Sequence, residues 1–185
     1  FEDFFYYVVQ ICKNHGLVKG EQIITDGTLI EANASIDSLV EREEPQGPPN
    51  ENSDKNRSNY KKKLSNKTHI SKTDPDATMA HKDNSKKGLK YKAHFSIDGE
   101  SRVILDNKIT TGGLHECNEY LNRINFIESK LDLNIKEAIA DRGYGTGEII
   151  GAIKNKSIIP FIPLFSRNSG SGALSTDAGF FYDSK

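Results

Sequence analysis

Two aspartates each follow an apolar run and stand at the start of a glycine-containing turn. Residues 22–30 read Gln-Ile-Ile-Thr-Asp-Gly-Thr-Leu-Ile and place Asp26 directly before Gly27. Residues 137–145 read Glu-Ala-Ile-Ala-Asp-Arg-Gly-Tyr-Gly and place Asp141 two positions before Gly143. Apolar β-branched residues favour a strand, and glycine favours the turn that follows it. We interpret Asp26 and Asp141 as a pair of carboxylates presented at strand ends.

The pairing of these carboxylates indicates a metal site. Neighbouring strands lie about 4.8 Å apart, so facing aspartates repel each other unless a cation lies between them. Mg²⁺ takes oxygen ligands and keeps positions open for water and substrate phosphate. Asp26 and Asp141 are therefore predicted to be catalytic residues and metal ligands for phosphoryl chemistry. The alternative is that each is a turn residue, because Asp-Gly is also a common turn dipeptide.

The charge of the chain is unevenly distributed. The formal net charge is −1, yet residues 37–54 hold six acidic side chains against Arg42 alone. Residues 55–92 hold twelve Lys or Arg against three Asp, a local excess of nine positive charges. Such a segment attracts a phosphate backbone through counterion release and long-range steering. The alternative is a solvated insertion whose lysines keep it soluble.

Length and composition indicate one domain outside the membrane. The 185 residues suffice for one ordinary core, and no apolar run approaches the roughly 20 residues that cross a bilayer. Two cysteines, Cys12 and Cys117, are too few for a disulfide framework, so we expect reduced thiols in a cytoplasmic protein. Residues 180–185 resemble an interrupted strand. We therefore expect residues 1–185 to be a partial domain that lacks its C-terminal part.

Periodicity predicts the elements that position the two aspartates. We expect a helix of about 14 residues, then a strand over 22–30, and a charged, flexible insertion at about 36–88. A hairpin follows over 89–98 and 102–109, turning at Asp98-Gly99, with an apolar face at 91, 93, 95 and 97 and a polar face between them. A helix over about 117–131 leads to a strand at 135–140, which we expect to be buried on both faces. Thr146 caps a last helix, and two prolines confine a strand at 158–163 to a sheet edge.

This order of elements matches an α/β ribonuclease H-like fold. An antiparallel trio of strands followed by two crossover units gives a mixed five-stranded sheet of order 3-2-1-4-5, flanked by helices. Strands one and four are central neighbours in that sheet. The arrangement therefore places Asp26 beside Asp141.

Four blocks of sequence resemble the catalytic core of bacterial insertion-sequence transposases of the DDE type: residues 26–35, 73–77, 89–98 and 140–145. The resemblance implies that Asp26 and Asp141 are the first two acids of the triad and bind two Mg²⁺ ions, for which Mn²⁺ substitutes. It implies metal-dependent DNA cleavage and strand transfer. The third acid of that family, a Glu on a later helix, has no match, since Glu148 comes too early. We expect it beyond residue 185, so that this piece alone is inactive.

The resemblance also implies partners and a location. The partners are insertion-sequence terminal repeats and target DNA, bound by a homodimer in a synaptic complex, in the cytoplasm and associated with the nucleoid. Arg142 and Tyr144 flank the catalytic turn, and His94 lies on the predicted polar face of its strand. We predict that these three residues bind nucleic acid together with the lysines of the basic segment: Lys61, Lys62, Lys63, Lys86, Lys87 and Lys90.

Three other interpretations remain open. Gly143, Gly145 and Gly147 form a glycine-rich turn before a helix, but their spacing fits neither nucleotide-loop pattern. An aspartyl-phosphate phosphatase would use Asp26 as its nucleophile, although that class needs a second Asp where Thr28 stands and parallel strands where a hairpin is predicted. The third interpretation is a DNA-binding transposase remnant without catalytic activity.

Overall fold

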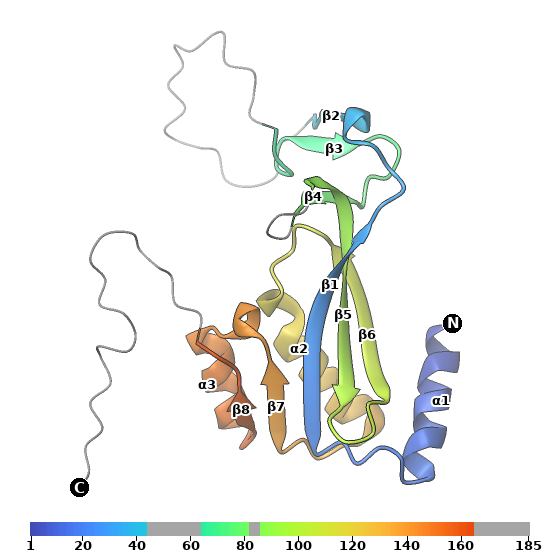
Figure 1. Cartoon of the computed structure of the whole chain (residues 1–185), viewed down its shortest axis with the longest axis vertical. Coiled ribbons are helices and arrows are strands. Elements are labelled where there is room, and N and C mark those ends of the chain that lie inside the picture. Colours follow the sequence, from blue (N-terminus) through green and yellow to red (C-terminus); the bar gives the residue numbers. More distant parts are fainter. Residues whose placement is uncertain (44–63, 82–85, 165–185) are drawn as a thin grey trace, which may run out of the picture.

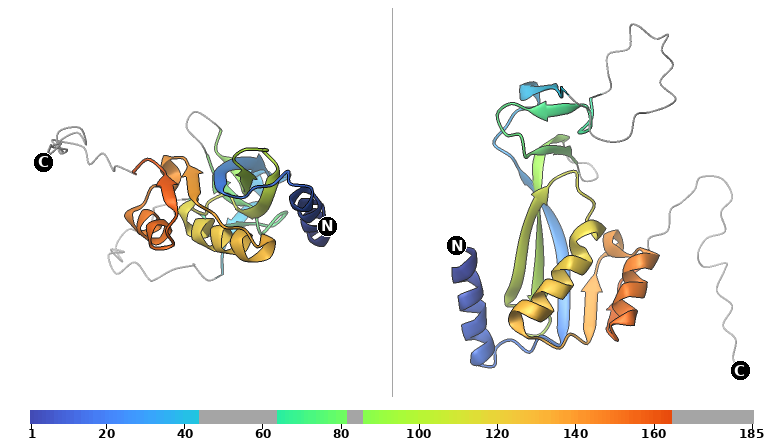
Figure 2. Two further views of the ribbon diagram at one scale, coloured as in Figure 1. Left: turned by 90° about the horizontal axis from the view of Figure 1, so that it is seen from below. Right: turned by 180° about the vertical axis from the view of Figure 1, so that it is seen from behind.

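The computed structural model describes residues 1–43, 64–81 and 86–164. Its centre is a six-stranded mixed sheet (Figure 1). The sheet contains β1 (Gln22–Glu31), β4 (Thr78–Ala80), β5 (Gly88–Asp98), β6 (Ile104–Thr111), β7 (Glu137–Ala140) and β8 (Ile159–Phe161). The helices are α1 (Glu2–Asn14), α2 (Cys117–Leu131) and α3 (Gly147–Asn155). Helices α2 and α3 cover one face of the sheet, and α1 lies beside its β6 edge (Figure 2).

The strand pairings are those of the ribonuclease H-like arrangement. β1 pairs antiparallel with β5 and parallel with β7, β6 pairs antiparallel with β5, and β8 pairs parallel with β7. The predicted order 3-2-1-4-5 is therefore confirmed for β6, β5, β1, β7 and β8. The sheet differs from the prediction by one added strand, because β4 pairs antiparallel with the first residues of β5.

Local sequence explains where the helices begin and end. α1 ends at Asn14, and Gly16 takes the left-handed conformation with φ 72°, which costs glycine no steric strain. The Thr146 hydroxyl accepts a hydrogen bond from the Ile149 amide and caps α3, as predicted. The two prolines do confine β8 to the sheet edge, since within the described residues it pairs only with β7. No helix in these residues combines the length and the apolar character needed to cross a membrane.

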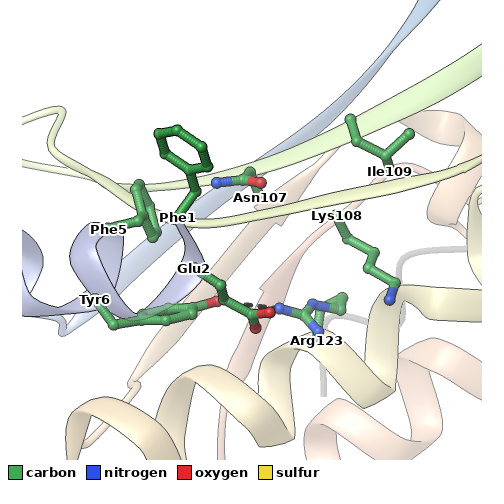
Figure 3. Close-up of a pocket in the computed structure, with 8 residues that line it drawn as sticks. All are labelled: Phe1, Glu2, Phe5, Tyr6, Asn107, Lys108, Ile109 and Arg123. Carbon is green, nitrogen blue, oxygen red and sulfur yellow. Dashed lines mark hydrogen bonds between the residues drawn. The ribbon is translucent and has the colours of Figure 1, made fainter.

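The main core lies between the sheet and α2 with α3. Ile124 and Ile127 of α2 and Ile153 of α3 pack with Ile23 of β1, and each of these four side chains is 0% exposed. Burying one such side chain stabilises the fold by about 1.5–3 kcal/mol. The helix α1 is attached at the β6 edge, where Tyr6 and Arg123 line a polar pocket (Figure 3). This core fixes the central strands that carry the candidate site.

The predicted faces of the β5 strand were wrong. His94, Ser96 and Asp98 are buried, whereas Phe95 is 37% exposed. The polar side chains point to the core because they find partners there: Ser96 Oγ lies 2.9 Å from Thr25 Oγ1, and His94 Nε2 lies 3.0 Å from Thr110 Oγ1. In the described part, no helix covers the opposite face of the sheet (Figure 2). For the same reason β7 is fully buried on one face only, and the prediction that both of its faces are buried was wrong.

The predicted flexible insertion contains regular structure in its described parts. A 3₁₀ turn at Ile36–Ser38 precedes β2 (Leu39–Glu41), which pairs antiparallel with β3 (His69–Ser71). A small cluster of buried Ala77, Met79 and Leu89 joins this region to the main sheet through β4. These strands are three residues long, too short for a periodic pattern to show. Residues 44–63 and 82–85 lie outside the described residues, and with them Lys61, Lys62 and Lys63.

Candidate active site

The register of the two central strands places Asp26 and Asp141 side by side. Thr25 of β1 is paired with Ala140 of β7, and the next residue on each chain is the aspartate. Both aspartates are exposed. Because β1 and β7 are parallel and in this register, the two aspartates are neighbours, although Asp26 lies in the middle of β1 and Asp141 directly follows β7. Neighbouring parallel strands thus bring together residues separated by more than a hundred positions in sequence.

Each carboxylate is oriented by a backbone amide of the glycine that follows it. Asp26 Oδ1 accepts a hydrogen bond of 2.7 Å from the Gly27 amide. Asp141 Oδ1 accepts one of 2.8 Å from the Gly143 amide and so caps the 3₁₀ turn Arg142–Tyr144. The turn interpretation therefore describes Asp141 in part, whereas Asp26 lies within β1. The antiparallel pairing of β1 with β5 disagrees with the phosphatase interpretation, which needs parallel strands there.

A third carboxylate, that of Glu116, enters the site from the start of α2. A Cβ atom built on Gly143 would lie 2.6 Å from Glu116 Oε2 and 3.0 Å from Asp141 Oδ1. A Cβ atom built on Gly27 would lie 3.2 Å from Glu116 Oε1. The Glu116 carboxylate thus occupies the space that the two glycines leave open.

Sequence reasoning missed Glu116, although its position carries a weak signal. Glu116 is the N-cap residue of α2, a position where Ser, Thr, Asp and Asn are preferred. Its side chain makes no capping hydrogen bond with the helix. The Glu116 carboxylate instead lies near Gly27 of β1 and Gly143 of the turn after β7.

Lys92 supplies a positive charge beside these carboxylates. Its Nζ lies 3.4 Å from Glu116 Oε1 and donates a hydrogen bond of 2.9 Å to the Leu114 carbonyl. The Lys92 side chain is 12% exposed and that of Glu116 is 23% exposed. This partial burial limits screening by water, so the ion pair is stronger than one on the open surface.

The Tyr144 hydroxyl points into the same space. The Tyr144 side chain is 0% exposed, and its ring centroid lies 5.0 Å from that of Tyr120. A Cβ atom on Gly27 would lie 3.2 Å from the Tyr144 hydroxyl oxygen, which has no hydrogen-bond partner in the part of the chain that is described. Burial raises the pKa of this hydroxyl, and the carboxylates of Glu116, Asp141 and Asp26 raise it further. The Tyr144 hydroxyl therefore stays protonated and can donate a hydrogen bond to an acceptor.

The residues predicted to bind nucleic acid divide into exposed and buried groups. Arg142, beside Asp141, is exposed, as are Lys86 and Lys87 before β5. Lys90 is 6% exposed, with its Nζ 4.0 Å from Glu31 Oε1, and His94 is 4% exposed. These two residues and the buried Tyr144 present too little surface for the direct DNA contact predicted from the sequence. Burial lowers the pKa of His94, and the charge of Lys92 lowers it further.

The oxygen donors at the site are of the kind that a hard divalent cation prefers. No group of three or more His, Cys, Asp or Glu side chains in the described ranges is already arranged to hold a metal ion. The space between Gly27 and Gly143 is nevertheless bounded by carboxylate oxygens and one hydroxyl that lacks a partner. Oxygen ligands of this kind are those that Mg²⁺ and Mn²⁺ prefer. Asp26 and Asp141 are the residues that would hold such an ion.

Comparison with known proteins identifies the family. Two solved structures match the chain: the Mos1 mariner paired-end complex with Mn and the Mos1 transposase paired-end complex with the left transposon end. Each has a TM-score of 0.38 and 8% sequence identity, and each match covers 84% of this chain and 39% of the other. No curated protein matches the chain. The family model of the transposase DDE domain matches residues 19–174, so the chain belongs to the transposase DDE domain family.

Proposed function

We propose that this chain carries part of the catalytic site of a transposase that cleaves DNA and joins strands with the help of divalent cations. The observation that carries the proposal is the register of β1 with β7, which sets Asp26 of β1 beside Asp141, the residue that follows β7. Two exposed carboxylates on adjacent parallel strands repel each other, and a cation relieves the repulsion. Mg²⁺ or Mn²⁺, as two ions, would activate the attacking oxygen and stabilise the leaving oxygen at phosphorus.

The residues of this chain would orient those ions and the DNA. Asp26 and Asp141 are fixed by the amides of Gly27 and Gly143, so their oxygens need little rearrangement on binding. Arg142 is exposed directly after Asp141 and is placed to contact a phosphate of the bound strand. Lys86 and Lys87 add positive charge for contacts that do not depend on sequence.

The biological setting belongs to the same proposal. We infer a bacterial insertion sequence as the origin, its terminal repeats and target DNA as substrates, and a homodimer as the form that brings two ends together in the nucleoid. The chain spans 39% of the chains in the structures that it matches. Full activity is therefore proposed for a whole transposase, to which this chain would contribute Asp26 and Asp141.

Nicking of DNA by the complete protein tests the proposal. We expect the wild-type protein to nick supercoiled plasmid DNA in Mg²⁺, and Asp26→Asn or Asp141→Asn to reduce the rate about 100-fold or more. Asp132→Asn is the matched control, because it makes the same chemical change at a fully exposed position where Asn tolerates the left-handed backbone. Wild-type nicking that survives both substitutions would refute the proposed site, and DNA binding without any nicking would favour a non-catalytic remnant.

A further inference from the structure

We propose that Glu116 is an additional carboxylate ligand of the divalent-cation site, that Lys92 holds it there, and that the Tyr144 hydroxyl donates a hydrogen bond to it when the cation binds. This inference deepens the proposed function, because it concerns the same cation site as Asp26 and Asp141. It adds a ligand from a segment that carries neither aspartate, the connection between β6 and α2. The occupant of the site is a hard divalent cation such as Mg²⁺ or Mn²⁺.

The first support is the geometry of the two glycine turns. Glu116 Oε2 and Asp141 Oδ1 both lie within 3.0 Å of the point where a Gly143 side chain would begin. Glu116 Oε1 lies 3.2 Å from the corresponding point at Gly27, directly after Asp26. The Glu116 carboxylate therefore lies beside Asp141 and against Gly27 of β1, the residue that follows Asp26. A side chain at either glycine would press against it.

The second support is the orphaned hydroxyl of Tyr144. A buried hydroxyl without a partner costs about 1–3 kcal/mol, so its persistence needs an explanation. The hydroxyl oxygen lies 3.2 Å from the same Gly27 position as Glu116 Oε1. A small shift of the Glu116 carboxylate, as a cation draws it in, gives this hydroxyl an acceptor. The hydroxyl would then fix the orientation of a ligand, as outer groups do at other metal sites.

The third support is the balance of charge. Asp26, Asp141 and Glu116 are three acidic residues, and Lys92 supplies one ammonium at 3.4 Å from Glu116. One positive charge leaves this cluster net negative, which favours a cation of charge two. The start of α2 also carries the positive end of its helix dipole, which stabilises the Glu116 carboxylate where it stands. Lys92 thus keeps the ligand in place before the cation binds.

A purely structural role makes different predictions. If Glu116 served only as the ion-pair partner of Lys92, then removing its charge would lower stability and leave cation affinity unchanged. If Glu116 is a ligand, cation affinity falls even where the fold is intact. Binding of Mn²⁺ measured directly, without DNA and without turnover, separates the two roles.

The experiment is a titration of the complete protein with Mn²⁺, in which electron paramagnetic resonance measures the free ion. We expect Glu116→Gln to weaken Mn²⁺ binding about 10-fold or more. Glu119→Gln is the matched control, since it removes the same charge three residues further along α2 and should leave the affinity within about 2-fold of wild type. Circular dichroism and thermal melting establish that each variant is folded.

A second variant keeps the Glu116 charge and moves it. Glu116→Asp keeps the negative charge and withdraws the carboxylate by one methylene, without a new atom beside Asp141. We expect weaker Mn²⁺ binding by Glu116→Asp, with a melting temperature close to that of wild type. This variant keeps the inference testable if Glu116→Gln does not fold.

The outcomes separate this inference from the proposed function. Mn²⁺ binding lost in Asp26→Asn and Asp141→Asn, but unchanged in both Glu116→Gln and Glu116→Asp, overturns the role of Glu116 and leaves the two-aspartate site standing. Binding that is unchanged in the two aspartate variants overturns the proposed site itself. Wild-type protein that binds no Mn²⁺ overturns both.

Discussion

The Tyr6 hydroxyl donates a 2.6 Å hydrogen bond to Asp106 Oδ1 across one hundred residues of sequence. The same carboxylate receives Arg123 Nε at 2.7 Å and forms an ion pair with the other end of that guanidinium. Asp106 is 1% exposed. One buried carboxylate of β6 therefore joins α1 to α2, beside the polar pocket of Figure 3.

Replacing Asp106 should destabilise the protein strongly. Asp106→Asn leaves the half-buried Arg123 guanidinium without its counter-charge, and breaking a buried pair in this way costs about 3–5 kcal/mol. Tyr6→Phe removes one hydrogen bond and should cost only about 1–2 kcal/mol. Urea unfolding followed by circular dichroism measures both. The control is Lys136→Gln, which breaks an exposed pair with Glu21 and should cost less than about 1 kcal/mol.

Asp98 should support stability in a way that depends on pH. Burial alone would raise the pKa of this carboxyl. Hydrogen bonds from the amides of Ser101, Gly20 and Glu100 and from the Ser101 hydroxyl outweigh burial, so the pKa lies below the ordinary value of 3.8. The stabilisation is thus present above pH 3.8 and disappears as the pH falls through the lowered folded-state pKa.

The variant Asp98→Asn tests this dependence. The amide cannot ionise, so the acid side of the curve of unfolding free energy against pH should become flatter than in wild type. At pH 7 the variant should also lose about 1–3 kcal/mol, because one side-chain oxygen can no longer accept hydrogen bonds from the turn amides. Urea unfolding between pH 2 and pH 7 measures both effects. Parallel curves for the two proteins would contradict the assignment.

His94 should make the stability of the protein depend on pH in a higher pH range than Asp98 does. Burial lowers its pKa below the ordinary 6.5, with Lys92 and Arg123 adding to the effect and Glu116 and Glu119 opposing it. Between the folded and unfolded pKa values the unfolded chain binds more protons, so stability falls as the pH drops below about 6.5. In His94→Gln, which keeps an amide near Thr110, this slope should vanish between pH 5 and pH 7. Calorimetric melting at pH 5, 6 and 7 measures it.

Local sequence was sufficient to predict that Asp26 and Asp141 follow apolar runs on neighbouring strands, and the register of β1 with β7 confirms that they lie side by side. It was also sufficient for the sheet order, since hairpins and crossovers restrict topology. It failed at His94, whose polar type suggested solvent although partners such as Thr110 allow burial. Glu116 has only a weak local signal, its place directly before α2. Its proposed role depends on the contact between the start of α2, β1 and the turn after β7. The periodicity of a single segment contains no information about such contacts.

Exposed positive charge at Arg142 and directly before β5 should make DNA affinity depend on salt. Arg142, Lys86 and Lys87 are exposed, and each phosphate contact releases counterions. The variant Lys86→Gln/Lys87→Gln should therefore weaken binding of a mixed-sequence duplex and reduce the slope of log affinity against log salt by about 2. Arg142→Gln should reduce that slope by about 1 and, because it lies beside Asp141, should also slow nicking.

Fluorescence anisotropy with a labelled duplex between 50 and 200 mM salt, roughly the range over which such contacts change affinity most, measures the slopes. Lys19→Gln is the matched control: Lys19 is exposed but its Nζ is bound to Glu100 at 2.7 Å, so its charge is already compensated. We expect its slope to equal that of wild type. If the slope decreases equally in Lys19→Gln and in the Lys86/Lys87 variant, DNA binding depends on the overall charge of the protein and not on Lys86 and Lys87. If the slope decreases only in the Lys86/Lys87 variant, the bound DNA contacts the protein at the start of β5.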